Sequence, residues 1–438
     1  MDADNNHYDA VVVGAGLAGL IAARELSQAG LSTLLIEARD RLGGRTNTVE
    51  FAGIPVESGG TYYNLDRQQN MVEEFARYGL KTRYTKSDIA YRTRLNGQVL
   101  TGACPVPFDQ VDDLIRVVYQ AIHDSHQIDV NDEDWAQKAR EFDIPFTEWL
   151  SRIPLPQETW EYVMAWIAIY AGNEPREISA LAILGPYIAA LGHSPWGWFA
   201  GVSYEVEGGS RLYRQAIVDD SPGLTIKLET PIARVEQDDS LIRFTARGGE
   251  TFTCTDAVWA TPLNTWSDVD FVGLSQPKQD AAKAKHIGGH HKLWMRARNV
   301  PAGLFGISYE SAFKMMQGYA QLDSGETVLF AMTEHTQLDV DDHSAVEAEL
   351  RKFEPDAELL ETYYEDWMGS EFSQGTWIES RPGFLTDYVP HFDRPEGRIR
   401  FAGADVNKRW LSWMAGAVAS GNDAAHDIIS ARAAAGLR

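Results

Sequence analysis

The chain contains little cysteine and no long apolar segment. Its 438 residues include only two cysteines, Cys104 and Cys254, which are too few for a disulfide framework or a thiolate metal site. Proline, glycine or a charged residue interrupts every apolar run, so the sequence predicts no membrane-spanning helix. Residues 1–7 are acidic and lack the basic and apolar regions of a signal peptide. We therefore expect a cytoplasmic protein without a membrane anchor.

Basic residues are scarce relative to acidic ones. The chain has 39 lysines and arginines against 63 acidic residues, a net charge of −24. This excess argues against nucleic acid as a partner, because no basic surface would remain to neutralise phosphates, and it disfavours anionic membranes. Solubility accounts for the charge, and a field that attracts cationic ligands is a second interpretation. The length favours about two to three domains.

The most informative motif lies near the N-terminus. The apolar segment 8–13 leads into Gly14, Gly16 and Gly19, a spacing that predicts a strand, a tight turn and a helix whose free N–H groups bind a pyrophosphate. A second strand, predicted over 31–36, ends at Glu37. A carboxylate there can accept both ribose hydroxyls and would repel a 2′-phosphate. The sequence therefore predicts a dinucleotide site.

The residues after Glu37 indicate which dinucleotide is bound. Segment 39–46 adds a second glycine pair and several arginines beside the pyrophosphate, a clamp of little use to an enzyme that releases its cofactor. With this segment, with 57–62 and with 397–405, the chain resembles the FAD-binding amine oxidase family, which includes monoamine, polyamine and L-amino acid oxidases and bacterial nicotine oxidoreductases. The resemblance covers nearly the whole chain and is weakest over 88–203.

The resemblance implies an α/β fold in which a Rossmann-like FAD-binding domain carries an inserted α+β substrate domain, a mixed sheet plus helices. We expect the FAD-binding domain to comprise 1–87, 204–275 and 367–438, and the substrate domain 88–203 and 276–366. Apolar periodicity predicts helices over 111–124 and 160–171 and a helix-rich segment 88–203. Short strands are expected over 224–228, 232–237, 241–246 and 257–261. Block 276–366 should form strands plus one helix near 343–352.

The cofactor implied by the resemblance is FAD. The residues matched to its binding are Gly14, Gly16, Ala18, Gly19, Glu37, Ala38, Arg39, Gly43, Gly44, Arg45, Gly60, Thr61, Tyr62, Ile232, Trp367, Asp405 and Met414. Trp367 is expected beneath the flavin and Asp405 near the ribityl-pyrophosphate portion. Met414 lies on a helix predicted to open over 410–418 and run to about 430. Its N-terminus would stabilise the reduced flavin anion, whereas an ordinary surface helix of small residues is the alternative. Thr376 replaces the cysteine of covalently flavinylated relatives, which implies non-covalent FAD.

The resemblance also matches three residues to catalysis. Trp377 and Trp413 correspond to the two walls of an aromatic cage that orients a neutral amine, although tryptophans more often only fill a core. Lys292 corresponds to a lysine that holds a water near flavin N5. Its alternation with Trp294 and Arg296 is also typical of a solvated strand face.

These matches imply a flavin-dependent amine oxidase. A small-molecule amine would lose a hydride equivalent to flavin N5 and become an imine, and dioxygen or another acceptor would then take the electrons. A homodimer is compatible with the resemblance. Two alternatives stay open, a desaturase or porphyrinogen-type oxidase acting on C–C bonds and a non-catalytic flavin-binding protein. No metal is expected, because His290 and His291 would point to opposite faces of a strand and no ligand joins them or His286 at metal spacing.

Overall fold

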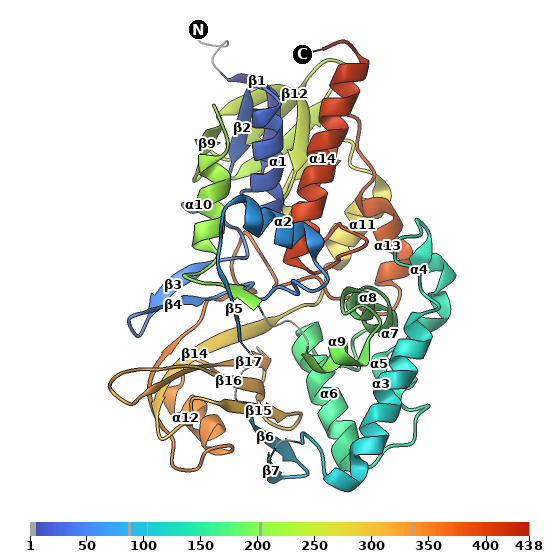
Figure 1. The fold of residues 1–438 in the computed structure, drawn as a ribbon. Helices are drawn as coiled ribbons and strands as arrows, with labels where there is room; N and C mark the ends of the chain where they lie inside the picture. The colour runs from blue at the N-terminus through green and yellow to red at the C-terminus, as the bar shows by residue number, and fades with distance from the viewer. Residues whose placement is uncertain (1–5, 86–88, 103, 201–203, 335, 438) are drawn as a thin grey trace.

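The computed structural model describes residues 6–85, 89–102, 104–200, 204–334 and 336–437. Figure 1 shows one large sheet packed against long helices at the top, and a second sheet with a group of helices below. The first and last described residues lie near each other at the top of the molecule.

Eight strands of the described chain form the first sheet, in which β12 lies between β1 and β11 and also pairs with β19. They are β1 (His7–Val13), β2 (Thr33–Ile36), β9 (Thr225–Lys227), β10 (Ile232–Gln237), β11 (Ile242–Ala246), β12 (Thr251–Trp259), β13 (Asp270–Phe271) and β19 (Ile399–Phe401). The central strands β12, β1, β2 and β9 are parallel, whereas β11 runs antiparallel to both strands beside it, β10 and β12. Parallel strands covered on both faces require continuous apolar residues, which explains the buried run at the end of β1.

Helices α1 (Leu17–Gln28) and α14 (Met414–Ala434) pack together against this sheet (Figure 1). Small residues permit their close approach, since a Cβ on Gly421 would lie 2.4 Å from the Ala18 carbonyl oxygen. The C-terminal helix is thereby fixed to the helix that follows the glycine-rich turn. The two motifs at opposite ends of the sequence meet in one place.

The second sheet has seven strands within the described residues, in the order β18-β14-β17-β16-β15-β6-β7. Their bounds are β6 (Ala90–Leu95), β7 (Gln98–Gly102), β14 (His290–Arg298), β15 (Leu304–Ser308), β16 (Phe313–Gln321), β17 (Thr327–Glu334) and β18 (Glu358–Tyr363). Two further pairs are β3 (Thr48–Phe51) with β4 (Ile54–Glu57), and β5 (Thr82–Tyr84) with β8 (Tyr204–Val206).

Of the remaining helices, α10 (Arg211–Asp219) lies beside α1 at the first sheet, and most of the others lie at the middle or in the lower part of the molecule (Figure 1). The others are α2 (Gln69–Arg77), α3 (Val111–Ser125), α4 (Trp135–Lys138), α5 (Phe146–Leu150), α6 (Gln157–Ala171), α7 (Ala180–Ala182), α8 (Ile188–Ala190), α9 (Pro195–Ala200), α11 (Gln276–Ala284), α12 (His343–Arg351) and α13 (Phe384–Phe392). Short 3₁₀ helices occupy Phe108–Gln110, Arg140–Phe142 and Leu263–Asp268. A π-helical turn, Ile183–Tyr187, joins α7 to α8 and contains Pro186.

The α/β class, with a nucleotide-binding type of sheet and a second mixed sheet, is confirmed. Segment 88–203 is rich in helices as predicted, with α3 and α6 at the expected places, and it also contains the hairpin β6–β7, in which β6 pairs with β15 from far along the chain. Two local predictions are wrong. Block 276–366 contains α11 as well as α12, and Ser275 followed by Pro277 was a helix-start signal for it. The helix expected from 410 begins at Met414, because Ser412 has φ +76°, which no right-handed helix accommodates.

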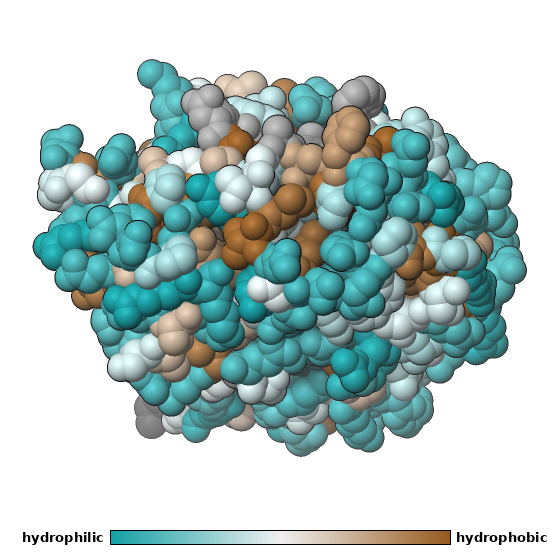
Figure 2. All heavy atoms as spheres, turned by 90° about the horizontal axis from the view of Figure 1, so that it is seen from below, coloured by the Kyte–Doolittle hydropathy of each residue, from teal (hydrophilic) through white to brown (hydrophobic). Residues whose placement is uncertain are grey.

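The face of the molecule that carries β6 and β7 is predominantly hydrophilic (Figure 2). Figure 2 views the molecule from the side of β6 and β7, where an apolar band interrupts a largely teal surface. None of the described helices is both long and apolar enough to cross a membrane.

Candidate functional site

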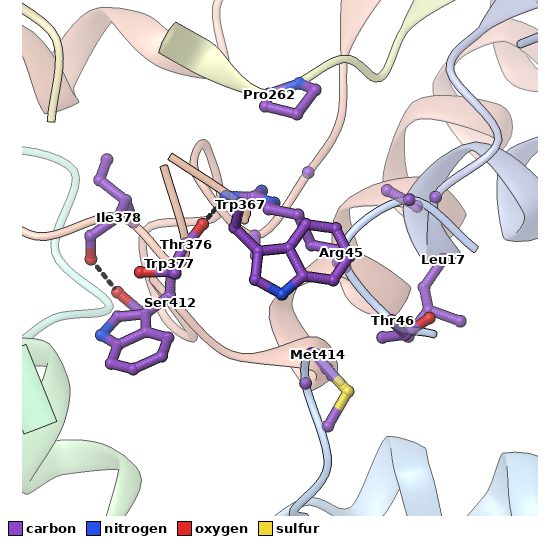
Figure 3. A pocket seen from close by; sticks show the side chains of 18 of the residues that line it. Leu17, Arg45, Thr46, Pro262, Trp367, Thr376, Trp377, Ile378, Ser412 and Met414 are labelled. Atoms are coloured by element: carbon purple, nitrogen blue, oxygen red, sulfur yellow. Dashed lines mark hydrogen bonds between the residues drawn. The ribbon is translucent and has the colours of Figure 1, made fainter. Parts of the chain in front are cut away.

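A long cavity of about 410 Å³ runs between the two sheets, from Glu37 at one end to Trp377 and Trp413 at the other. All the predicted site residues line it except Gly19 and Asp405. Figure 3 shows this arrangement, with Leu17 and Thr46 on one side of the view, Trp377, Ser412 and Ile378 on the other, and Trp367, Arg45 and Met414 between them.

The Glu37 end is built by the turn between β1 and α1. Gly14 has φ +100°, and a Cβ there would lie 2.7 Å from the Ala260 carbonyl oxygen, so only glycine fits. Gly19 does not reach the cavity; it lets the helix approach the strand, since a Cβ would lie 1.8 Å from the Gly14 oxygen. The N-terminus of α1 has no side-chain cap, which leaves its N–H groups for a ligand.

Glu37 is buried, and its carboxylate already accepts two backbone hydrogen bonds. Ala15 N–H donates to Oε2 at 2.7 Å, and Arg39 N–H donates to Oε1 at 2.9 Å. These bonds hold the carboxylate at the edge of the cavity and leave its remaining lone pairs for ribose hydroxyls. Glu37 therefore both organises the turn and offers acceptors to a ligand.

The second glycine pair lies directly against the first turn. Gly43 N–H donates to the Ala15 carbonyl at 2.7 Å, and a Cβ on Gly44 would lie 3.0 Å from the Gly16 Cα. Both glycines have positive φ, +104° and +55°. The two loops thus form one cradle of backbone groups. Side chains at these glycine positions would prevent a pyrophosphate from reaching it.

Arg45 connects this cradle to the C-terminal segment. Its guanidinium donates to the Thr376 carbonyl at 2.5 Å and to Asp405 Oδ1 at 2.8 Å. Asp405 is buried outside the cavity, and its other oxygen accepts the Leu263 N–H at 3.1 Å. Burial by itself would raise the pKa of Asp405, but Arg45 and these hydrogen bonds hold that pKa below its ordinary value. Asp405 therefore positions Arg45 rather than lining the cavity.

The middle of the cavity is shaped by Trp367, Met414 and the loop 58–61. Trp367 is buried and its indole N–H donates to the Ser58 carbonyl at 3.0 Å. A Cβ on Gly60 would lie 3.1 Å from Met414 Sδ. Met414 is the first residue of α14, whose N-terminus also lacks a side-chain cap. A planar ring system placed here would meet a helix N-terminus, which favours negative charge.

Lys292 lies on β14 and is buried, so its strand face is a cavity wall and not a solvated surface. Its ammonium donates to the Gly59 carbonyl at 2.6 Å and to the Thr61 hydroxyl, and the rings of Tyr62 and Phe330 are within 6 Å. Burial lowers the pKa of Lys292 to about 8, and the negative charges of Glu57 and Glu205 oppose that shift.

The far end of the cavity is aromatic. Trp377 donates its indole N–H to the Tyr170 carbonyl at 2.7 Å, and Trp413 stacks on Tyr187 at a centroid distance of 6.5 Å and 7° between planes. Tyr170 and Tyr187 are themselves 4.0 Å apart. Both tyrosines line the cavity, and sequence reasoning missed them because they belong to the segment that resembles the family least. Pro186 in the π-helical turn is the local signal that could have drawn attention to Tyr187.

The histidines do not form a metal site in the described part of the chain, where no group of three or more potential ligands converges. Burial lowers the pKa of His286 to about 4, so this side chain is neutral. His290 and His291 are neighbours on β14 and project to opposite faces.

The glycine cradle, the Glu37 end and the planar middle section fit an FAD, and they define a flavin-dependent oxidoreductase. Comparison with known proteins gives the family: residues 17–429 match the one described as flavin containing amine oxidoreductase, and the chain belongs to it. It is therefore an FAD-dependent enzyme that oxidises amines.

Similar proteins extend along the whole chain. A pseudooxynicotine dehydrogenase of Pseudomonas sp is 31% identical, with 97% of this chain and 87% of that protein covered. The (S)-6-hydroxynicotine oxidase of Paenarthrobacter nicotinovorans is 28% identical over 96% of this chain and 99% of its own length. A solved putrescine oxidase with putrescine bound has the same fold, with a TM-score of 0.82 at 23% identity over 97% of this chain and 99% of that one.

Proposed function

We propose that the enzyme oxidises a small amine, which binds between Trp377 and Trp413 with its reacting nitrogen in the neutral amine form. The observation that carries this proposal is the aromatic end of the cavity, which is continuous with the FAD cradle. FAD, when bound, supplies an acceptor for the hydride equivalent of the amine α-carbon and passes the electrons to dioxygen or another acceptor. The test is anaerobic bleaching of the flavin by a panel of amines, followed by peroxide release in air.

The roles of the chain follow from this geometry. The two indoles would orient the amine by their faces and exclude water, and Tyr170 and Tyr187 would hold the indoles in place. Lys292 would hold a water at the flavin edge, with its ammonium fixed by Gly59. We assign no proton-accepting carboxylate to the C–H step, since a neutral amine does not need one.

The nicotine-related relatives suggest where to begin the panel. The names of two of these relatives include pseudooxynicotine and 6-hydroxynicotine. We include them together with primary alkylamines and diamines. The alternative of a C–C desaturase is disfavoured, because such an enzyme would not need the paired aromatic faces of Trp377 and Trp413.

The division into domains supports the same proposal. We assign residues 1–87, 204–275 and 367–438 to FAD binding, and 88–203 with 276–366 to substrate binding. The first sheet, with β1, β12 and β19, comes from the former group, and the second sheet from the latter. A cytoplasmic location and a homodimer remain predictions, to be tested by cell fractionation and by sedimentation of the purified enzyme.

FAD is expected to be held without a covalent bond. The residue in the position of a flavin-linking cysteine is Thr376, whose hydroxyl cannot form a thioether. Acid precipitation of the yellow protein should leave all of the flavin in the supernatant. Flavin that stays with the washed precipitate would contradict this assignment.

Replacing Glu37 with alanine should weaken FAD binding more than tenfold. The variant loses charge-assisted hydrogen bonds to ribose, each worth roughly 1.5–3 kcal/mol, together with the acceptor for Ala15 N–H. Glu37→Gln keeps an acceptor oxygen without the charge, so its affinity for FAD should lie between those of the wild type and Glu37→Ala. The measurement is the FAD dissociation constant by fluorescence titration of apoenzyme. Equal affinities for all three proteins would show that Glu37 does not face the ribose.

A further inference from the structure

One carboxylate in the cavity has no role in the chemistry described so far. Glu379 lines the cavity two residues beyond Trp377 and is only 8% exposed. The other carboxylates that line the cavity in the described chain have partners: Glu37 holds two backbone N–H groups, Glu371 pairs with Arg247, and Asp268 accepts from Gln374. Within the described residues, the side chain of Glu379 has a hydrogen bond from the Ser380 backbone N–H and no ion pair.

The backbone around Glu379 places it on the substrate side. Thr376 is bound by Arg45 of the FAD cradle, and Ser380 accepts a hydrogen bond from Ser179 N–H at the start of α7 at 2.8 Å. The Glu379 carbonyl accepts from Ile287 N–H at 2.9 Å. The segment 376–380 therefore leads away from the FAD cradle, toward the helices that carry the tyrosines.

In the part of the chain that the structure describes, no cation pairs with Glu379. The basic residues nearest the middle of the cavity are held elsewhere, Lys292 by Gly59 and Thr61 and Arg45 by Asp405. Burial accordingly raises the pKa of Glu379 to about 8. Ionising a buried carboxyl group is costly without a cation beside it, so Glu379 would ionise when a cationic ligand binds next to it.

We propose that Glu379 binds a second, cationic group of the substrate, so that the preferred substrates are diamines or amines carrying a basic group a few bonds from the reacting nitrogen. This inference rests on the proposed amine oxidation. The reacting nitrogen must be neutral, and a carboxylate beside it would favour its ammonium form. Glu379 lies two residues beyond Trp377, and two residues span at most roughly 7 Å of backbone, so the cationic group would lie a few bonds from the reacting nitrogen.

Binding of the cationic group changes the protonation state of Glu379. At neutral pH the empty site holds a protonated carboxyl group. When the cationic group arrives, the carboxyl group releases its proton to solvent and an ion pair forms in its place. No oxidant or additional reactant is required for this step.

The test compares two sets of primary amines that differ only in charge. One set ends in a trimethylammonium group and the other in its uncharged tert-butyl isostere, with spacers of about two to five carbons to span the expected separation. Anaerobic stopped-flow traces give the rate of flavin reduction and its dependence on amine concentration. The wild-type enzyme should favour the charged amine at the best spacer by about tenfold or more.

Glu379→Gln should reduce that preference to less than about threefold while leaving reduction by the uncharged amine within about twofold. Glutamine matches the neutral carboxyl in shape, and retained FAD and an unchanged melting temperature would show that it folds. Glu177→Gln removes one carboxylate from an exposed position near Ser179 and should keep the full preference.

Three results would overturn the inference. A wild-type enzyme reduced equally by both sets has no cation site. A Glu379→Gln enzyme slowed equally with both sets would place the carboxylate at the reacting nitrogen or in a structural role. A holoenzyme that no amine of the wider panel reduces would refute the amine oxidase proposal itself, and this inference with it.

Discussion

Replacing Lys292 with methionine should slow reoxidation of the reduced enzyme by dioxygen roughly a hundredfold, the lower end of the effect of losing one preorganised electrostatic group. The ammonium is fixed by Gly59 and Thr61 at the middle of the cavity, where it can hold a water. Anaerobic reduction by amine should change less, because that step does not use the water. Double-mixing stopped-flow experiments measure both rates.

The same variant should alter the pH dependence of stability. Burial lowers the pKa of Lys292 to about 8, so the charged side chain destabilises the native state at neutral pH. The native state releases this proton as pH rises through 8, and the unfolded chain does so only near the ordinary lysine value. The free energy of unfolding of the wild type therefore rises by about 3 kcal/mol as pH increases from 8 to the ordinary lysine value. The methionine variant lacks this increase.

Melting temperatures of the two proteins from pH 7 to pH 10 test this point. The wild type should improve relative to Lys292→Met as pH rises, with the lost hydrogen bonds to Gly59 and Thr61 shifting both ends alike. Parallel curves would show that the lysine is not desolvated. In the stopped-flow experiments, slow flavin reduction of Lys292→Met with unchanged reoxidation would instead assign Lys292 to substrate binding.

The residues of the proposed FAD cradle could be predicted because the interactions that determine them are formed within short segments of the sequence. Gly14, Gly16 and Glu37 lie within one short β-α-β segment, and the backbone dictates the residue at each point. Arg45 and Asp405 illustrate the limit, since their pairing joins residues 360 positions apart. The resemblance implies that Asp405 lies near the ribityl-pyrophosphate portion of FAD, and in the structure it is buried and holds Arg45, which lines the cavity.

The substrate end was less predictable. Tyr170 and Tyr187 lie on elements whose apolar pattern indicates only a buried helix, and their meeting with Trp377 and Trp413 depends on how separate segments pack. Glu379 gave no signal in the sequence, because a carboxylate is notable only once it is known to be buried without a cation. Backbone strain at Ser412, which sets the direction of Trp413, was likewise invisible.

Replacing Trp377 or Trp413 with alanine should lower the rate of flavin reduction, and not only the apparent affinity for amine. Each indole offers a face worth about 0.5–2 kcal/mol in orienting and desolvating the substrate. Because the two side chains are held separately, by the Tyr170 carbonyl and by the Tyr187 ring, either can be removed without displacing the other's support. We expect a loss of about threefold to thirtyfold for each variant.

Phenylalanine at either position supplies the matched control, since it restores an aromatic face while removing the indole N–H. Trp413→Phe should recover most of the reduction rate, because stacking on Tyr187 needs only a ring. Trp377→Phe should recover less, because it also loses the 2.7 Å hydrogen bond to Tyr170 that fixes the wall. Alanine variants that melt at lower temperature yet reduce their flavin at the wild-type rate would show that both tryptophans only fill the core. Equal recovery by the two phenylalanine variants would show that the Tyr170 hydrogen bond does not orient the cage.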